Sequence, residues 1–83
     1  MAKKTKEQIY KELVDDISKR FDIKKSKITP ELNFITDVDA DSIDFVELVL
    51  ELEDKYQLEI PDEEAEKLVT LQQTVDYVES NQG

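Results

Sequence analysis

Apolar residues in the first part of the chain recur at the spacing that places side chains on one face of an α-helix. They are separated by four positions each, at Ile9, Leu13 and Ile17. Thr5, with Gln8 three residues later, matches the capping box that begins many helices. Together these signals predict an amphipathic helix over about 6–20.

Three further helices are predicted downstream. The segment SIDFVELVLELEDKY predicts a helix that begins near 41–42 and ends at about Tyr56. A proline followed by three acids predicts a short helix over about 61–67, because proline suits the first turn and acids suit the positive end of a helix. Thr70 and Gln73 repeat the capping-box pattern and predict a last helix.

A long, irregular connection from about 22 to 40 joins the first two predicted helices. Pro30 disfavours helix before it. Four apolar residues are expected to pin the connection to the core: Leu32, Phe34, Ile35 and Val38. The predicted fold is a single all-α domain over 1–83, a four-helix bundle of three longer helices and one short one, with 1–4 and 80–83 frayed.

The second predicted helix has apolar residues on two faces. At about 100° per residue, the wider sector faces the core and contains Phe45, Leu48, Val49, Leu52 and Tyr56. A second sector contains Ile43, Val46 and Leu50, and acidic residues surround it. An exposed apolar strip with an acidic rim suits a partner groove with basic edges. The alternative is that this strip packs beneath the long connection.

Charge narrows the possible classes of partner. The chain has 21 acidic and 11 basic residues and a formal net charge of −10. This charge repels nucleic acid and anionic membranes and steers basic protein surfaces toward the chain, although acids can also serve solubility alone. No apolar run has the length of a transmembrane helix, and none follows the N-terminal lysines as in a secretory signal, so we expect a cytoplasmic protein.

Most residue types that enzymes use as bases or soft metal ligands are missing. The sequence has no Cys and no His, hence no thiol nucleophile and none of the commonest general bases. Ser42 lies between Asp41 and Asp44, which would oppose an oxyanion, and its simplest role is a helix cap. Alternating aspartates before Ser42 resemble the start of a calcium loop, but the required later Gly and Glu are absent. We therefore expect no catalytic residue and no tight metal site, and loose binding of divalent cations to the clustered acids stays open.

The residues around Ser42 resemble a known family. Asp41-Ser42-Ile43-Asp44 is similar to the Asp-Ser-Leu attachment motif of acyl carrier proteins. The string EIPDEEAEK over 59–67 resembles carriers of the dissociated (type II) bacterial fatty acid synthases, and the resemblance covers nearly the whole chain. The chain departs from the family at Val38, Asp39, Ile43 and Phe45, where Leu, Gly, Leu and a smaller, often polar residue are usual.

The resemblance implies that Ser42 receives 4′-phosphopantetheine from coenzyme A through a separate, Mg²⁺-dependent phosphopantetheinyl transferase. The thiol of this arm would hold acyl chains as thioesters for fatty acid synthase enzymes and acyltransferases. The residues implied in partner binding are Asp41, Ile43, Asp44, Val46, Glu47, Leu50, Glu53 and Asp54. Those implied to line an acyl pocket are Phe34, Leu48, Leu52, Ile60, Ala65 and Leu68.

The predicted function is therefore a non-catalytic acyl carrier that acts as a monomer. A specialised carrier, for polyketide or phospholipid acyl transfer, is the alternative within the same class. From another class, the chain could be an acidic interaction module in which Ser42 only caps a helix. Substituting Ser42 by Ala separates the two classes, since it abolishes carrying but removes only a cap from a scaffold.

Overall fold

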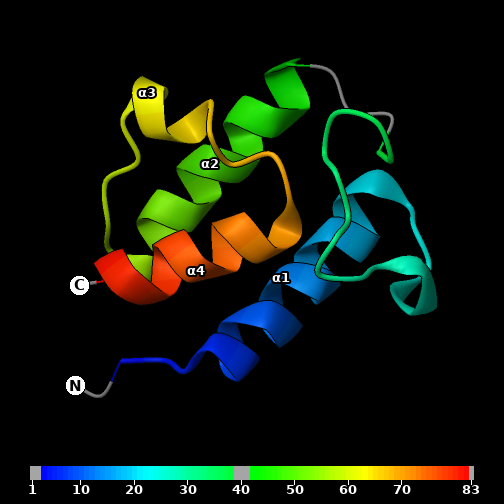
Figure 1. Cartoon of the computed structure of the whole chain (residues 1–83), viewed down its shortest axis with the longest axis horizontal. Coiled ribbons are helices and arrows are strands. Elements are labelled where there is room, and N and C mark those ends of the chain that lie inside the picture. The colour runs from blue at the N-terminus through cyan, green and yellow to red at the C-terminus, as the bar shows by residue number, and fades with distance from the viewer. Residues whose placement is uncertain (1–2, 39–41, 83) are drawn as a thin grey trace.

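The computed structural model describes residues 3–38 and 42–82, except for the side chain of Ser42. Helices are joined there by turns and irregular segments, and the only strand pairing in this described part is an isolated bridge between Asn33 and Thr70. The described residues form three long helices, one single-turn helix and one 3₁₀ turn, and the four α-helices are labelled in Figure 1. They are α1 (Lys6–Phe21), η1 (Lys25–Lys27), α2 (Ser42–Tyr56), α3 (Asp62–Ala65) and α4 (Leu71–Asn81). The predicted all-α, four-helix architecture is confirmed. None of these helices is both long and apolar enough to cross a membrane.

Both predicted capping boxes are present. At the start of α1, the Gln8 backbone N–H donates to Thr5 Oγ1 at 3.2 Å, and the Thr5 N–H donates to Gln8 Oε1 at 2.9 Å. Thr70 and Gln73 form the same pair of bonds, with the same lengths, at the start of α4. Each box gives partners to N–H groups that a helix N-terminus leaves unpaired.

Helix α3 is shorter than the predicted 61–67. Pro61 lies just before it, with extended backbone, as the N-cap. After Ala65 the hydrogen bonds change to three-residue spacing: the Leu68 N–H donates to the Ala65 carbonyl at 3.1 Å. The α-helical pattern ends because these tighter turns replace the four-residue bonds that would have continued it.

The long helices pack around one apolar core. Helix α1 packs along α4, and α2 contributes its predicted inner face. The most deeply buried side chains are Ile9, Leu13, Ile17, Leu48, Leu52, Leu71 and Val78. Since each long helix places an apolar stripe in this cluster, the spacing of apolar residues predicted the core well.

The long connection is pinned to the core at three of its four predicted apolar residues. Leu32, Phe34 and Val38 are buried, but Ile35 is 74% exposed, which corrects the prediction for that residue. The Asn33 side chain explains the difference, since its Oδ1 accepts the Ile35 N–H at 2.7 Å and turns the chain outward. The Phe34 N–H, by contrast, donates to the Val69 carbonyl at 2.9 Å.

The two ends of the described chain hydrogen-bond to each other. The Lys4 N–H donates to Gln82 Oε1 at 2.9 Å, and Gln82 Nε2 donates to the Lys4 carbonyl at 2.7 Å. Lys4 and Gln82 are thus bonded to each other, residues 1, 2 and 83 lie outside the described residues, and the expectation of frayed ends at 1–4 and 80–83 stays a prediction. An amide side chain has both a donor and an acceptor, so Gln82 pairs with both backbone groups of Lys4.

Candidate functional site

Ser42 is the first residue of α2. Its side chain and residues 39–41, including the predicted partner residue Asp41, lie outside the described residues. The N-terminal end of a helix this long carries partial positive charge, which favours an anionic group such as a phosphodiester. Ile43, the next residue, is exposed. The modification of Ser42 stays a prediction at this point.

The second apolar sector of α2 is open to solvent, as predicted. Ile43, Val46 and Leu50 are each more than half exposed. The alternative, in which this strip packs beneath the long connection, is therefore excluded. We call these three residues the apolar strip; its role in partner binding stays a prediction.

The acidic residues of α2 differ in what they contact. Glu47 and Asp54 are exposed, and Asp44 is half-buried. Glu53 is half-buried and its Oε2 accepts the Ile60 N–H at 2.9 Å. One Glu53 carboxylate oxygen is thus bonded to the α2–α3 connection, although Glu53 lies one turn from Leu50 on the helix, and its role in partner binding stays a prediction.

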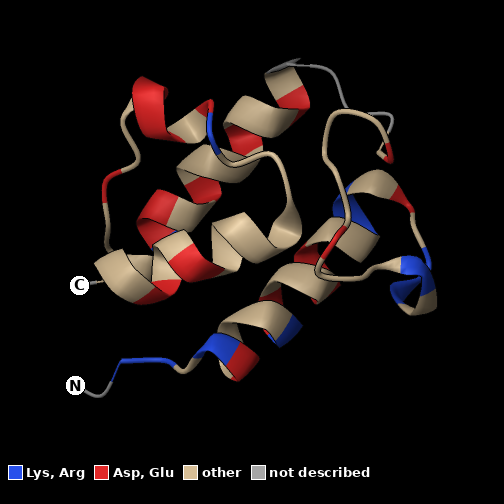
Figure 2. Ribbon diagram, in the orientation of Figure 1, with Lys and Arg blue, Asp and Glu red and all other residues tan. Residues whose placement is uncertain are grey.

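Charge is unevenly distributed along the chain. Nine of the 11 Lys and Arg residues precede Ile28, and 16 of the 21 acidic residues follow it. In Figure 2, red acidic residues mark α2, α3 and α4, whereas blue residues gather at the two ends of α1 and at η1. The acidic excess expected from composition therefore lies after Ile28, and most of the basic residues lie before it, at the N-terminus, in α1 and around η1.

Arg20 connects these two regions, and the sequence analysis missed it. Its Nη1 lies 3.5 Å from Glu47 Oε2, and its Nη2 pairs with Glu51 Oε2. Both pairs join α1 to α2 across 27 or more residues of sequence. Local spacing gives no signal for such a contact; the only hint is that Arg20 is the single arginine of the chain.

The residues predicted to line an acyl pocket lie in one cluster. Phe34, Leu48, Leu52, Ile60 and Leu68 are buried in the core, and Ala65 packs half-buried against it. Phe45, one of the departures from the family pattern, lies with its ring centroid 6.1 Å from that of Phe34. The cluster is assembled as expected, and whether it opens for an acyl chain stays a prediction.

A polar network holds the far end of α2 against α1. Glu12 accepts hydrogen bonds from the Tyr56 hydroxyl and the Lys4 ammonium, each at 2.7 Å. Partial burial opposes ionisation of Glu12, but these hydrogen bonds and the charges of Lys4 and Lys55 outweigh it and lower its pKa. Burial and the bond to Glu12 raise the pKa of Tyr56 far above its usual value. The shifts in pKa therefore extend the pH range over which Glu12 is ionised toward acid and the range over which Tyr56 is neutral toward base.

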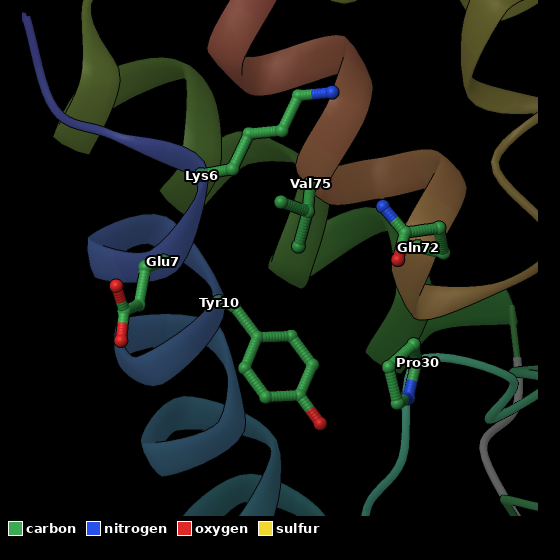
Figure 3. A pocket seen from close by; sticks show the side chains of 6 residues that line it. All are labelled: Lys6, Glu7, Tyr10, Pro30, Gln72 and Val75. Carbon is green, nitrogen blue, oxygen red and sulfur yellow. The ribbon is translucent and has the colours of Figure 1, made fainter.

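A shallow pocket lies elsewhere, between α1, α4 and the long connection. It encloses about 300 Å³. Figure 3 shows the side chains that line it: Lys6, Glu7, Tyr10, Pro30, Gln72 and Val75. None of these was predicted as a site residue. Among the residues with described placement, no three acidic side chains gather as metal ligands would.

Comparison with known proteins identifies the family. A family model described as a phosphopantetheine attachment site matches residues 11–78. The acyl carrier protein of Lactobacillus johnsonii is 55% identical over 79 residues, covering 95% of this chain and 99% of the relative. That of Lactobacillus acidophilus is 47% identical with the same coverage. The solved acyl carrier protein of Enterococcus faecalis is 45% identical and superposes with a TM-score of 0.83, covering 94% of this chain and 99% of that one. This chain therefore belongs to the acyl carrier protein family and contains its phosphopantetheine attachment domain.

Proposed function

We propose that Ser42 carries the 4′-phosphopantetheine arm and that the chain presents thioester-bound acyl groups to fatty acid synthase enzymes and acyltransferases. The observation that carries the proposal is the position of Ser42 at the start of α2, directly before the apolar strip. The chain has no Cys, so the thiol that bears the acyl group has to come from the arm.

Attachment is a phosphoryl transfer to the serine hydroxyl. A bond forms between Ser42 Oγ and the phosphorus that bears pantetheine, and the pyrophosphate bond of coenzyme A breaks. Adenosine 3′,5′-bisphosphate leaves, and the hydroxyl proton passes to a base of the transferase, since this chain has no His. The bound arm supplies thioester chemistry, and Ser42 supplies the anchoring oxygen on the positive end of α2.

Partners are expected to dock on the exposed face of α2. Three apolar side chains form the middle of this face, and the exposed carboxylates of Glu47 and Asp54 lie beside them. An enzyme groove that is apolar at its centre and basic at its rim would match both features. The other predicted partner residues are Asp41, Asp44 and Glu53, and their part in docking stays a prediction.

The acyl chain is expected to enter the core between the helices. Each CH₂ group withdrawn from water contributes about 0.8 kcal/mol, which favours insertion of the tail among apolar side chains. Ala65 supports this route, because it is small and half-buried at the edge of the cluster, next to the buried Leu68. The expectation of a cytoplasmic monomer stays a prediction.

A dedicated carrier is the second candidate, and one contact favours it. Phe45 packs near Phe34 beside the predicted pocket, where the family pattern has a smaller residue. A larger side chain there leaves less room for a long acyl tail. The test is to attach acyl groups of increasing length and to measure the melting temperature of each form. If Phe45 limits the pocket, the melting temperature of wild type should stop rising at a shorter acyl length than that of a Phe45→Ala variant.

Intact mass spectrometry tests the central proposal. The unmodified chain is incubated with coenzyme A, Mg²⁺ and a broad-range phosphopantetheinyl transferase. Wild type and Ser26→Ala, a control in the exposed η1 turn, should each gain one phosphopantetheine group, and Ser42→Ala should gain none. Circular dichroism checks that every variant is folded. Modified Ser42→Ala, or folded wild type without added mass, would overturn the proposal.

A further inference from the structure

We propose that Arg20 is an internal competitor for the basic groups of partner enzymes and so limits how strongly the exposed face of α2 is held. The inference rests on the proposed docking function of this face. Arg20 lies in the last turn of α1, and its guanidinium contacts two carboxylates on α2, those of Glu47 and Glu51.

The geometry makes Arg20 a fixed counter-ion rather than a solvated surface charge. Its side chain is only 25% exposed. Its Nε is buried and has no hydrogen-bond partner among the described residues, so the guanidinium is held in this part of the chain by the contacts of Nη1 and Nη2 with α2. A planar guanidinium can hold two carboxylates at once, whereas the single ammonium of a lysine is a point charge on a flexible stem.

The two contacts are unequal, which suits a displaceable competitor. Glu47 is more than half exposed, and its Oε2 lies 3.5 Å from Arg20 Nη1. Glu51 is less exposed and lies one turn further along α2. A partner's lysine or arginine can therefore take Glu47 while Arg20 stays on Glu51. Docking then exchanges an ion pair within the chain for one between proteins.

This exchange lowers affinity for a particular kind of partner. An enzyme whose basic residues approach Glu47 has to compete with Arg20, whereas one that relies on Asp54, about two turns away, does not. Exposed ion pairs have small free energies, which correspond to about a twofold to fivefold change in affinity. Arg20 thus tunes docking at the Ser42 half of α2 and leaves the other half unaffected.

A matched pair of variants isolates the effect. Arg20→Gln and Lys19→Gln each remove one positive charge from the last turn of α1. Lys19 is 76% exposed and pairs with Asp15 on its own helix, so its removal changes the total charge without releasing α2. Any difference between the two variants therefore reports on the contacts of Arg20 with Glu47 and Glu51.

Two assays apply, and one of them does not depend on attachment. In the first, KM is measured for transferase modification of the chain at several salt concentrations. Arg20→Gln should lower KM about twofold to fivefold relative to Lys19→Gln, with kcat unchanged. In chains that also carry Glu47→Gln, the KM values of Arg20→Gln and Lys19→Gln should no longer differ. In the second, the Kd of a tetralysine peptide is measured by NMR in a Ser42→Ala background, where Arg20→Gln should again bind more tightly.

The outcomes separate this inference from the proposed function. Equal KM and equal peptide Kd for Arg20→Gln and Lys19→Gln would overturn the competitor role while leaving Ser42 as the attachment site. Absent modification of wild type would overturn the proposed function, and the peptide titration would still decide on Arg20. If Arg20→Gln does not fold, Arg20→Lys keeps the charge but not the two-pronged contact, and it should bind the peptide more tightly than wild type does; equal affinity would overturn the competitor role.

Discussion

Leu50 and Leu52 offer a direct test of how α2 divides its two faces. They are identical residues two positions apart on one helix, yet Leu50 is 58% exposed and Leu52 only 1%. Substituting each by alanine removes the same atoms in nearly the same backbone setting. The comparison therefore separates the contribution of burial from that of residue type.

The expected losses differ severalfold. Leu52→Ala creates a cavity between helices and should cost about 2–5 kcal/mol of unfolding free energy. A domain of this size has roughly 4–12 kcal/mol in total, so the variant should lose a large share of it. Leu50→Ala should change stability by less than about 0.5 kcal/mol, because the side chain is mostly in water and alanine suits a helix.

Thermal and urea unfolding followed by circular dichroism measures these losses, since the chain has no Trp to report by fluorescence. At roughly 4–8 °C per kcal/mol, Leu52→Ala should lower the melting temperature by about 10 °C or more. Leu50→Ala should leave it nearly unchanged but raise the transferase KM. Equal destabilisation by the two variants would refute the division of faces, and an unchanged KM for Leu50→Ala would refute docking on the apolar strip.

Two further predictions concern interactions away from that face. The lowered pKa of Glu12 means that its ionised form stabilises the fold above the ordinary carboxyl value of 4.5 and that this contribution is lost as pH falls through the lowered pKa. Glu12→Gln should therefore be less stable than wild type by about 1 kcal/mol near pH 7 in urea unfolding, with the gap closing in acid; a gap independent of pH would contradict the network. Thr70→Ala removes one capping box and should cost about 1 kcal/mol, seen as a lower urea midpoint with an unchanged slope, and an unaltered midpoint would show that the cap contributes nothing.

The features that the sequence predicted correctly depend on residues close together in the chain. Thr5 and Gln8 are enough to mark the start of α1, and the spacing of Ile43, Val46 and Leu50 is enough to show a second face on α2. The attachment motif around Ser42 is likewise local, and comparison with known proteins confirms the family that it indicated.

Most features that the sequence analysis missed depend on contacts between residues far apart in the chain. One, at Ile35, depends on a local turn that the Asn33 side chain stabilises. Gln82 is buried because Lys4 lies beside it, 78 residues earlier. Glu53 is bonded by the N–H of Ile60, after the chain has reversed direction beyond α2. Periodicity cannot foresee such contacts, because they exist only once separate helices have packed together. Ile35 points outward for a local reason, the Asn33 turn, that hydrophobic spacing does not register.

The pairing of Lys4 with Gln82 nearly closes the backbone into a ring. Through Glu12 and Tyr56, Lys4 is also linked to the C-terminal end of α2, which lies about 20 Å along the helix from Ser42. Figure 1 accordingly shows both ends of the chain on one side of the molecule, and the start of α2 on another. A tag or second domain fused at either end would stand clear of the attachment serine. A short peptide joining the ends should permit circular permutation, with new termini opened in the long connection.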